Sequence, residues 1–281
     1  MTGSLTVRVA LVQSGLVPID AQVLLAHVLG KGRAWLAAHG DHVLTGGEEQ
    51  AFLALARRRR EGEPVGYLTG IREFWGLPLA VTPAVLVPRP ETEALVEIAL
   101  AQLPAERETR VLDLGTGSGA IALAIAHERP RAQVLATDAS VAALAVARDN
   151  AQRLGLATVE FLQSDWFASI PATWRGAPFD LVASNPPYVV AGDPHLTEGD
   201  LRFEPTAALS PGGDGVDALR RIVAGASGHL VPGGTLVVEH GYDQADAVRA
   251  LFAAAGFIDI VAARDLAGIP RVVAGRMRSP G

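Results

Sequence analysis

A glycine-rich segment in the middle of the chain has the residue types of a nucleotide-binding turn. The apolar run Val111–Leu114 leads into Gly115-Thr116-Gly117-Ser118-Gly119, and a helix is predicted to follow. Glycines at the start of a helix let the backbone approach a ligand closely, with the positive end of the helix dipole behind it. Asp138 directly follows the next predicted strand, where a carboxylate can accept hydrogen bonds from both hydroxyls of a ribose. The pattern indicates an adenosine-type cofactor, and its loose fit to the dinucleotide fingerprint leaves NAD open.

A second polar motif, Asn185-Pro186-Pro187-Tyr188, directly follows the apolar run Phe179–Ser184. In a doubly wound sheet, the strand that follows the chain reversal lies beside the first strand. We therefore expect Asn185 to face the glycine turn across the ligand crevice. The asparagine offers a carbonyl acceptor, the prolines remove N–H donors, and Tyr188 offers a flat face. Acceptors without donors beside an aromatic ring suit a planar NH2 group.

Together the two motifs predict methyl transfer from S-adenosyl-L-methionine to an amide or aromatic amino nitrogen. Such a nitrogen is a poor nucleophile because its lone pair is delocalised, and two acceptors on its hydrogens would favour the reactive pyramidal geometry. Asn185 would stand where the cofactor and substrate sites meet. Much of the rate would come from positioning, and the motif contains no strong general base.

The segments that must hold these residues alternate between strands and helices from residue 110 onwards. Alternation of this kind predicts an α/β domain with a mostly parallel sheet covered on both faces. We expect the final strand to be antiparallel. The predicted strands are Arg110–Leu114, Gln133–Thr137, Thr158–Leu162, Phe179–Ser184, Thr235–Glu239, Phe257–Val261 and Arg271–Arg276.

The first part of the chain has a different pattern. We expect residues 1–75 to form a small helical substrate-recognition domain, residues 76–90 a β-hairpin connector, and residues 91–281 the main α/β domain. Asp20 is predicted to cap one helix, and Thr45 with Glu48 has the spacing of a capping box at the start of another. The arginines at 57–60 are expected to form a solvated helix end.

Composition excludes several classes of protein. The 281 residues include no cysteine, which excludes disulfides, thiolate metal sites and cysteine nucleophiles, and no metal site is expected. Residues 1–90 carry 9 basic and 7 acidic side chains (net +2), whereas residues 91–281 carry 15 and 23 (net −8). An acidic second part argues against broad, direct nucleic-acid binding. No apolar run approaches the roughly 20 residues of a spanning helix, and no secretory signal is evident, so we expect a cytoplasmic protein without membrane contact.

Further motifs extend the pattern over residues 20–276. The chain resembles the HemK/PrmC family, the peptide chain release factor N5-glutamine methyltransferases. Asn-Pro-Pro-Tyr alone is shared with DNA and RNA amino-methyltransferases, whereas the segment Pro88–Glu93 is far more specific to the family. The matching segments are Glu63–Gly70, Glu73–Gly76, Val87–Glu93, Asp165-Trp166, Phe203–Pro205, Asp214-Gly215 and Asp265–Arg271.

The resemblance implies a Rossmann-like, seven-stranded class I methyltransferase domain and a specific reaction. Residues 115–119 would wrap the methionine end of the cofactor, Asp138 would bind the ribose, and Asp165 with Trp166 would meet the adenine. Residues 185–188 would hold the glutamine amide and close the site.

The implied substrate is the glutamine in the Gly-Gly-Gln loop of class I release factors, with S-adenosyl-L-homocysteine as the product and a monomeric enzyme. The alternatives are a glutamine of a ribosomal protein, the amino group of a nucleic acid, or a non-catalytic cofactor-binding module. Glu91, Glu93, His195 and Glu239 receive no assigned role.

Overall fold

The computed structural model describes residues 5–175 and 178–279 and divides into two compact units. The first, called here the helical unit, comprises Met1–Ile71 and Thr197–Phe203. The second, called the sheet unit, comprises Arg72–Leu196 and Glu204–Gly281. Among the described residues, no helix has both the length and the apolar composition needed to cross a bilayer.

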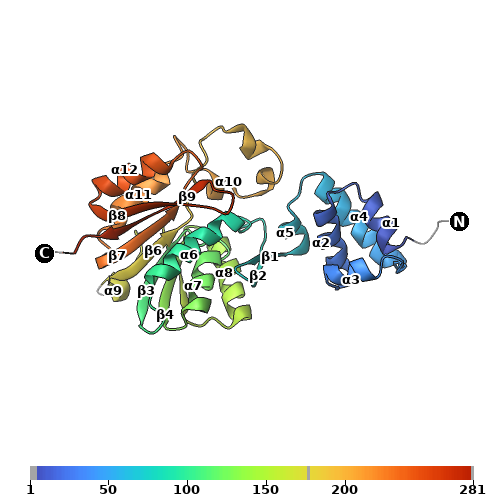
Figure 1. Cartoon of the computed structure of the whole chain (residues 1–281), viewed down its shortest axis with the longest axis horizontal. Helices are drawn as coiled ribbons and strands as arrows, with labels where there is room; N and C mark the ends of the chain where they lie inside the picture. Colours follow the sequence, from blue (N-terminus) through green and yellow to red (C-terminus); the bar gives the residue numbers. More distant parts are fainter. Residues whose placement is uncertain (1–4, 176–177, 280–281) are drawn as a thin grey trace. The chain divides into compact units, whose positions relative to one another are not determined.

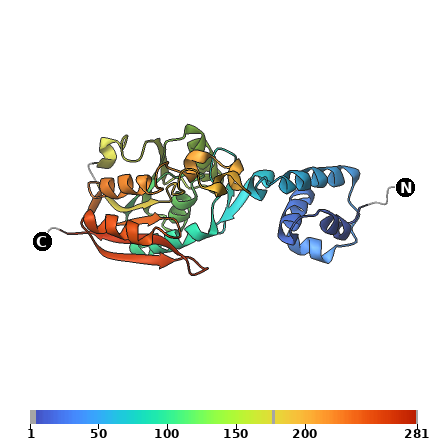
Figure 2. The same cartoon turned by 90° about the horizontal axis from the view of Figure 1, so that it is seen from above.

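The helical unit is built from short helices (Figure 2). They pack around a small apolar core that includes Leu24, Leu25 and Phe52, all fully buried. The capping box predicted at Thr45 and Glu48 is confirmed, with both reciprocal hydrogen bonds present. The helices are α1 Val7–Gln13, α2 Pro18–Leu29, α3 Arg33–Ala38, α4 Gly46–Arg60 and α5 Val65–Thr69, with the 3-10 turn η3 Leu201–Phe203 from the later segment.

One prediction for this unit is wrong. Asp20 is not a cap: α2 begins at Pro18, and the Asp20 carboxylate instead accepts from Arg59 Nε at 2.7 Å. The arginines at 57–60 do form the end of α4, and all but Arg59 are exposed. They also have partners: Arg58 makes a two-bond ion pair with Glu63, and Arg60 donates to a backbone carbonyl of the loop after α1. Long-range partners of this kind leave no local signal in a run of arginines.

The hairpin lies at residues 71–80, earlier than the expected connector at 76–90. Its strands are β1 Ile71–Phe74 and β2 Leu77–Ala80. Trp75 and Gly76 between them have φ values of +54° and +73°, the conformation of a two-residue type I′ turn. Phe74 is the only buried residue of β1. The strand therefore lacks the apolar pattern by which a strand is predicted from the sequence.

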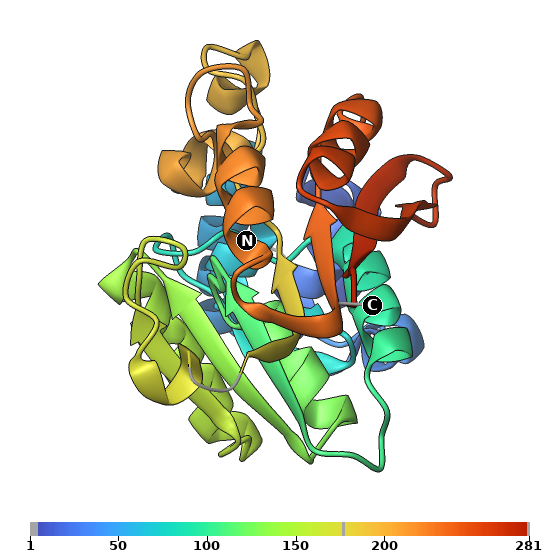
Figure 3. The same cartoon turned by 90° about the vertical axis from the view of Figure 1, so that its left-hand side faces the viewer.

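The sheet unit contains a seven-stranded sheet with the order β5-β4-β3-β6-β7-β9-β8 (Figures 1 and 3). β3 to β7 are parallel, and β9 runs antiparallel to β7 and β8. The α/β class, all seven strands and the antiparallel final strand are therefore confirmed. The strands are β3 Thr109–Leu114, β4 Ala132–Asp138, β5 Val159–Gln163, β6 Phe179–Ser184, β7 Leu230–Glu239, β8 Phe257–Arg264 and β9 Pro270–Met277.

Helices cover both faces of this sheet because its strands are apolar on both sides. Val111 packs in the core under α6, α7 and the hairpin, whereas its neighbour Leu112 packs in the opposite core, under α11 and α12. The helices are η1 Pro90–Thr92, α6 Glu93–Gln102, α7 Ala120–Glu128, α8 Val141–Leu154, α9 Ala172–Arg175, η2 Pro194–Thr197, α10 Thr206–Leu209, α11 Asp217–Ala226 and α12 Ala245–Ala254.

The strand order reverses between β3 and β6, which are parallel neighbours. Their last residues are register partners, Leu114 with Ser184, and the Ser184 hydroxyl donates to the Leu114 carbonyl at 2.7 Å. The residues that follow, Gly115 and Asn185, therefore leave the same edge of the sheet side by side. This is the topological switch point at which open α/β sheets bind ligands, and the predicted juxtaposition of the two motifs is confirmed.

Candidate active site

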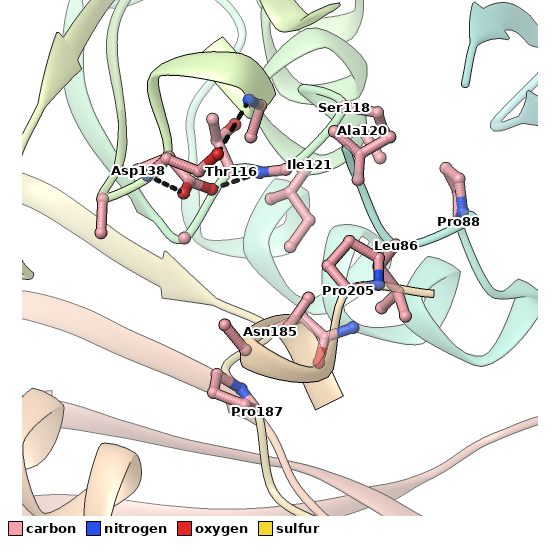
Figure 4. Close-up of a pocket in the computed structure, with 18 of the residues that line it drawn as sticks. Leu86, Pro88, Thr116, Ser118, Ala120, Ile121, Asp138, Asn185, Pro187 and Pro205 are labelled. Carbon is pink, nitrogen blue, oxygen red and sulfur yellow. Dashed lines mark hydrogen bonds between the residues drawn. The ribbon is translucent and has the colours of Figure 1, made fainter. Parts of the chain in front are cut away.

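A cavity of about 290 Å³ opens at this switch point, near the lower end of the sizes usual for small-molecule sites. Figure 4 shows Thr116 and Asp138 in one part of its wall and Asn185, Pro187 and Pro205 in another. Of the residues predicted from the sequence, the wall contains Gly115, Thr116, Gly117, Ser118, Asp138, Asp165, Trp166, Asn185 and Pro187. Gly119, Pro186 and Tyr188 are not among the lining residues.

The glycine turn is held in shape by Asp113, a fully buried residue of β3. Its Oδ2 accepts from Thr116 Oγ1 at 2.6 Å and from the Ala122 N–H at 3.2 Å. Burial raises the pKa of Asp113 to about 7, although both hydrogen bonds oppose that rise. Gly119 ends the turn at φ +88°, and a Cβ there would lie 2.9 Å from Leu123, so this glycine is required by the fold rather than by the cavity.

Asp138 joins the end of β4 to the glycine turn. One carboxylate oxygen accepts from the Gly117 N–H at 2.9 Å and the other from the Ser140 N–H at 2.8 Å. An ionised carboxylate can accept about four hydrogen bonds, so Asp138 retains acceptor capacity toward the cavity. The geometry fits a diol such as a ribose.

Asp165 and Trp166 approach the cavity from the segment after β5. Trp166 has φ +51°, and its carbonyl accepts from the Ser164 hydroxyl at 2.7 Å. A Cβ built on Gly115 would lie 3.6 Å from the Trp166 ring, which places the indole against the glycine turn. Asp165 is exposed and pairs with Arg221 at 2.7 Å. An aromatic face beside an acceptor is suited to a purine ring.

Asn185 contributes its side chain to the wall from the end of β6. Its Nδ2 donates to Thr92 Oγ1 at 3.0 Å, so Oδ1 is the side-chain atom that can accept from a bound substrate. Pro187 lines the cavity beside it, whereas Pro186 is buried.

Tyr188 is not among the residues that line this cavity. Its hydroxyl donates to Glu239 Oε1 at 3.1 Å, and burial, followed by the neighbouring Glu239 carboxylate, raises its pKa. Glu239, at the end of β7, is 1% exposed. Burial raises the pKa of Glu239 to about 7, against the hydroxyls of Thr92 and Tyr188 and the charge of Arg271, while Glu91 adds to the rise.

The structure adds wall residues that we did not single out from the sequence. Arg89 and Thr92 precede α6, and Pro205 belongs to the long segment after Tyr188. Arg89 Nη2 and Glu204 Oε1 lie 2.6 Å apart, and the Glu204 side chain is fully buried. This ion pair fixes the two segments against each other beside the cavity. Arg89 and Glu204 both lie in segments that match the family. Their ion pair could not be predicted from spacing, because the two residues are 115 positions apart.

Residues 105–255 match the family described as "Methyltransferase domain". With the switch-point cavity and its acceptor groups, this defines the sheet unit as a methyltransferase, and the chain is an enzyme of that class. Residues 8–70 match the family described as "PrmC N-terminal domain", and the chain belongs to the family of release factor glutamine methyltransferases.

Relatives of this family cover nearly the whole chain. The release factor glutamine methyltransferase of Xylella fastidiosa strain Temecula1 is 54% identical, with 92% of each chain covered. That of Escherichia coli K12 is 48% identical, covering 92% of this chain and 91% of the relative. A methyltransferase crystal structure from Pyrococcus furiosus shares the fold, with a TM-score of 0.55 at 16% identity, over 79% of this chain and 97% of the other.

Proposed function

We propose that this chain transfers a methyl group from S-adenosyl-L-methionine to the side-chain amide nitrogen (N5) of the glutamine in the Gly-Gly-Gln motif of class I peptide chain release factors. S-adenosyl-L-homocysteine would be the second product. The enzyme would act in the cytoplasm as a monomer on a protein substrate, without direct nucleic-acid binding.

One observation supports this proposal above all. The register pair Leu114–Ser184 brings Asn185 next to the glycine turn, and the bond to Thr92 engages the amide nitrogen of Asn185. An acceptor oxygen is thereby available beside a nucleoside-sized cavity. A substrate amide needs such an acceptor, because holding its N–H groups out of plane frees the nitrogen lone pair for attack.

The residues present fit the proposed cofactor. Asp138 would hold the ribose, Asp165 and Trp166 the adenine, and residues 115–118 the methionine end. The cofactor would supply an electrophilic methyl group. The chain would contribute orientation and exclusion of water, with Asn185 holding the glutamine amide and Pro187 in the wall beside it. Orienting two reactants in this way can supply much of a rate enhancement.

The substrate can be tested with labelled S-adenosyl-L-methionine and a purified class I release factor. We expect the intact Gly-Gly-Gln loop to be labelled and a loop changed to Gly-Gly-Ala to remain unlabelled. Equal labelling of both would overturn the substrate assignment.

Asn185→Ala provides a second test of the same site. The variant loses the acceptor for the substrate amide, so transfer should fall by about 100-fold or more, while the cofactor Kd stays near that of the wild type. Gln152→Ala, which removes an exposed amide from α8, should leave both quantities unchanged. If Asn185→Ala instead weakened cofactor binding with little effect on turnover, Asn185 would belong to the cofactor site alone.

A further inference from the structure

The direction of the Asn185 side chain depends on how the far end of its motif is held. Asn185 directly follows β6, and two prolines separate it from Tyr188. Each proline ring restricts its own φ to about −65°, so the backbone between the two residues is stiff. A shift of the Tyr188 backbone therefore moves Asn185 as well, and whatever fixes Tyr188 helps to aim the acceptor.

One side chain from another part of the sheet unit, that of Gln244, holds the Tyr188 carbonyl. Gln244 Nε2 donates to this carbonyl at 3.1 Å, and Gln244 Oε1 accepts from the Gly241 N–H at 2.9 Å. A carbonyl only accepts and an N–H only donates, so these two backbone groups allow a single orientation of the Gln244 amide. The side chain is 8% exposed and does not cap α12, which begins directly after it. Its contacts instead join the loop after β7 to the acceptor motif.

Gly215 leaves the room in which this hydrogen bond forms. Gly215 has φ +79°, and a Cβ there would lie 2.6 Å from the Tyr188 carbonyl oxygen and 3.0 Å from Gln244 Nε2. A larger residue would therefore push the donor and the acceptor apart. Gly212 provides a comparison, because its φ is +86° but a Cβ there would meet nothing within 4 Å.

We propose that Gln244 is a positioning residue for methyl transfer: its amide clamps Tyr188 to the loop after β7, and this clamp holds Asn185 Oδ1 toward the substrate amide. The inference rests on the proposed function and deepens it, since it names what aims the acceptor. Neither Gln244 nor Gly215 lines the cavity. Loss of the clamp should therefore lower kcat and leave the cofactor Kd unchanged.

Gln244→Met gives the first test, because methionine has a similar length but makes neither hydrogen bond. The variant should lower kcat by about 10- to 100-fold, the cost of a misplaced reacting group, with the cofactor Kd near that of the wild type. Gln152→Met makes the same change at an exposed position of α8 and should retain the wild-type kcat. A wild-type kcat in Gln244→Met would overturn the inference.

Gln244→Glu gives a pH signature that a loss of packing would not produce. An ionised carboxylate can accept from Gly241 but cannot donate to the Tyr188 carbonyl, whereas a protonated one can do both. Burial favours the protonated form, so the rate of Gln244→Glu relative to the wild type should recover as the pH falls from about 8 to about 5. Gln244→Met should stay slow throughout, and equal pH profiles of the two variants would contradict the clamp.

The charged groups around the clamp are the same in both variants, so their own titration cancels in this comparison. They act on Tyr188 or lie in or against the loop after β7: Glu239, Arg271, Arg89, His240 and Asp243.

The two glycines test the clamp without changing Gln244. Gly215→Ala and Gly212→Ala share the strain of a left-handed backbone, but only the first adds a methyl group beside the hydrogen bond to Tyr188. Gly215→Ala should lower kcat about as much as Gln244→Met, and the two changes together should be no slower than either alone. Gly212→Ala should keep most of the wild-type rate. Equal rates in the two glycine variants would show that strain alone is responsible.

A further measurement does not depend on the substrate. The buried Gly241 amide should exchange slowly with solvent in nitrogen-15 NMR spectra of the wild type and Gln244→Glu, which both supply an acceptor, and quickly in Gln244→Met. Unchanged exchange in Gln244→Met would also overturn the inference. If the exchange pattern holds but no release factor is methylated, the clamp stands and the proposed function fails.

Discussion

The site contains two buried carboxyl groups that accept hydrogen bonds from hydroxyl groups. Asp113 accepts from Thr116 and supports the glycine turn, and Glu239 accepts from Tyr188. Burial raises the pKa of each to about 7. Both groups therefore bind protons more tightly in the native state than in the unfolded chain, which links the geometry of the site to the stability of the fold.

Glu239→Gln should remove part of the pH dependence of stability. The raised pKa means that the contribution of Glu239 is fully present below about pH 4.5, its ordinary value, and is lost as the pH rises through about 7. Between pH 5 and pH 8 the free energy of unfolding of the wild type should fall by up to about 3 kcal/mol more than that of the variant. Asp113 is present in both proteins, so its contribution to the pH dependence cancels in this comparison.

Urea unfolding at several pH values measures this difference. Glu97→Gln makes the same change of charge at an exposed position of α6 and should keep the wild-type pH dependence. If Glu239→Gln and the wild type lost stability in parallel as the pH rose, Glu239 would not be the titrating group.

At this scale, the sequence predicted the residues that stand in contiguous motifs. Glycines mark the turn at residues 115–119, and two prolines directly follow Asn185. Both residue types restrict or free the backbone in ways that can be recognised from the sequence. Thr92 carries no such signal, because its hydrogen bond to Asn185 joins segments that lie far apart in the sequence. The hydrogen bond from the Tyr188 hydroxyl to Glu239 has no local signal either, because the two residues are 51 positions apart.

Among the elements, α8 connects the hairpin to the glycine turn through one buried side chain. Asn150 Oδ1 accepts from the Ala80 N–H at 2.7 Å, and its Nδ2 donates to the carbonyls of Ala80 at 3.0 Å and Ser118 at 2.9 Å. The edge of β2 is thereby satisfied by a side chain instead of another strand. The bond to the Ser118 carbonyl fixes one side of the turn that lines the cavity.

Asn150→Ala should destabilise the fold and weaken cofactor binding together. The change leaves three backbone groups without their partner, and each unsatisfied buried group costs about 1–3 kcal/mol, so we expect a loss of about 3 kcal/mol in the free energy of unfolding. Asn150→Asp should be no better, since a carboxylate cannot donate to the Ala80 and Ser118 carbonyls. Chemical denaturation and a cofactor titration measure the two effects.

Gln152→Ala, two residues further along α8 and exposed, is the control and should behave as the wild type. A stable Asn150→Ala variant with normal cofactor affinity would show that the hairpin and the turn hold their positions without this bridge.

The strands of the sheet unit were predictable because each is a short apolar run between turn residues. β6 was predicted with its observed bounds, Phe179–Ser184. The hairpin was misplaced because β1 is mostly exposed and has no apolar pattern, so its position is set by the turn at Trp75 and by tertiary packing of Phe74. Local patterns reveal buried elements better than exposed ones.

At the scale of the whole molecule, the chain passes between the two units three times. After Asn-Pro-Pro-Tyr it leaves the sheet unit, adds Thr197–Phe203 to the helical unit, and returns at Glu204. Composition and periodicity did not predict this excursion, since its anchors are long-range polar contacts. Arg59 pairs with Asp20 at 2.7 Å and with Asp200 at 2.5 Å, and Arg202 donates to the Glu61 carbonyl.

Arg59→Ala should loosen Thr197–Phe203 within the helical unit. Arg59 is partly buried between its two carboxylates, and its removal takes away the cation that holds both. Hydrogen bonds to charged groups contribute about 1.5–3 kcal/mol, so amide hydrogen exchange in this segment should accelerate by about 10- to 100-fold. Exchange in β3 and β6 should stay unchanged, because those strands open only with the sheet unit.

Arg57→Ala is the matched control, since Arg57 belongs to the same run but is exposed. Its exchange pattern should match that of the wild type. Arg59→Ala should accelerate exchange only in Thr197–Phe203. Because Arg89 holds Glu204 within the sheet unit, the amides after Glu204 should stay protected in this variant. Equal exchange of Thr197–Phe203 in the two variants would show that Arg59 does not anchor the segment.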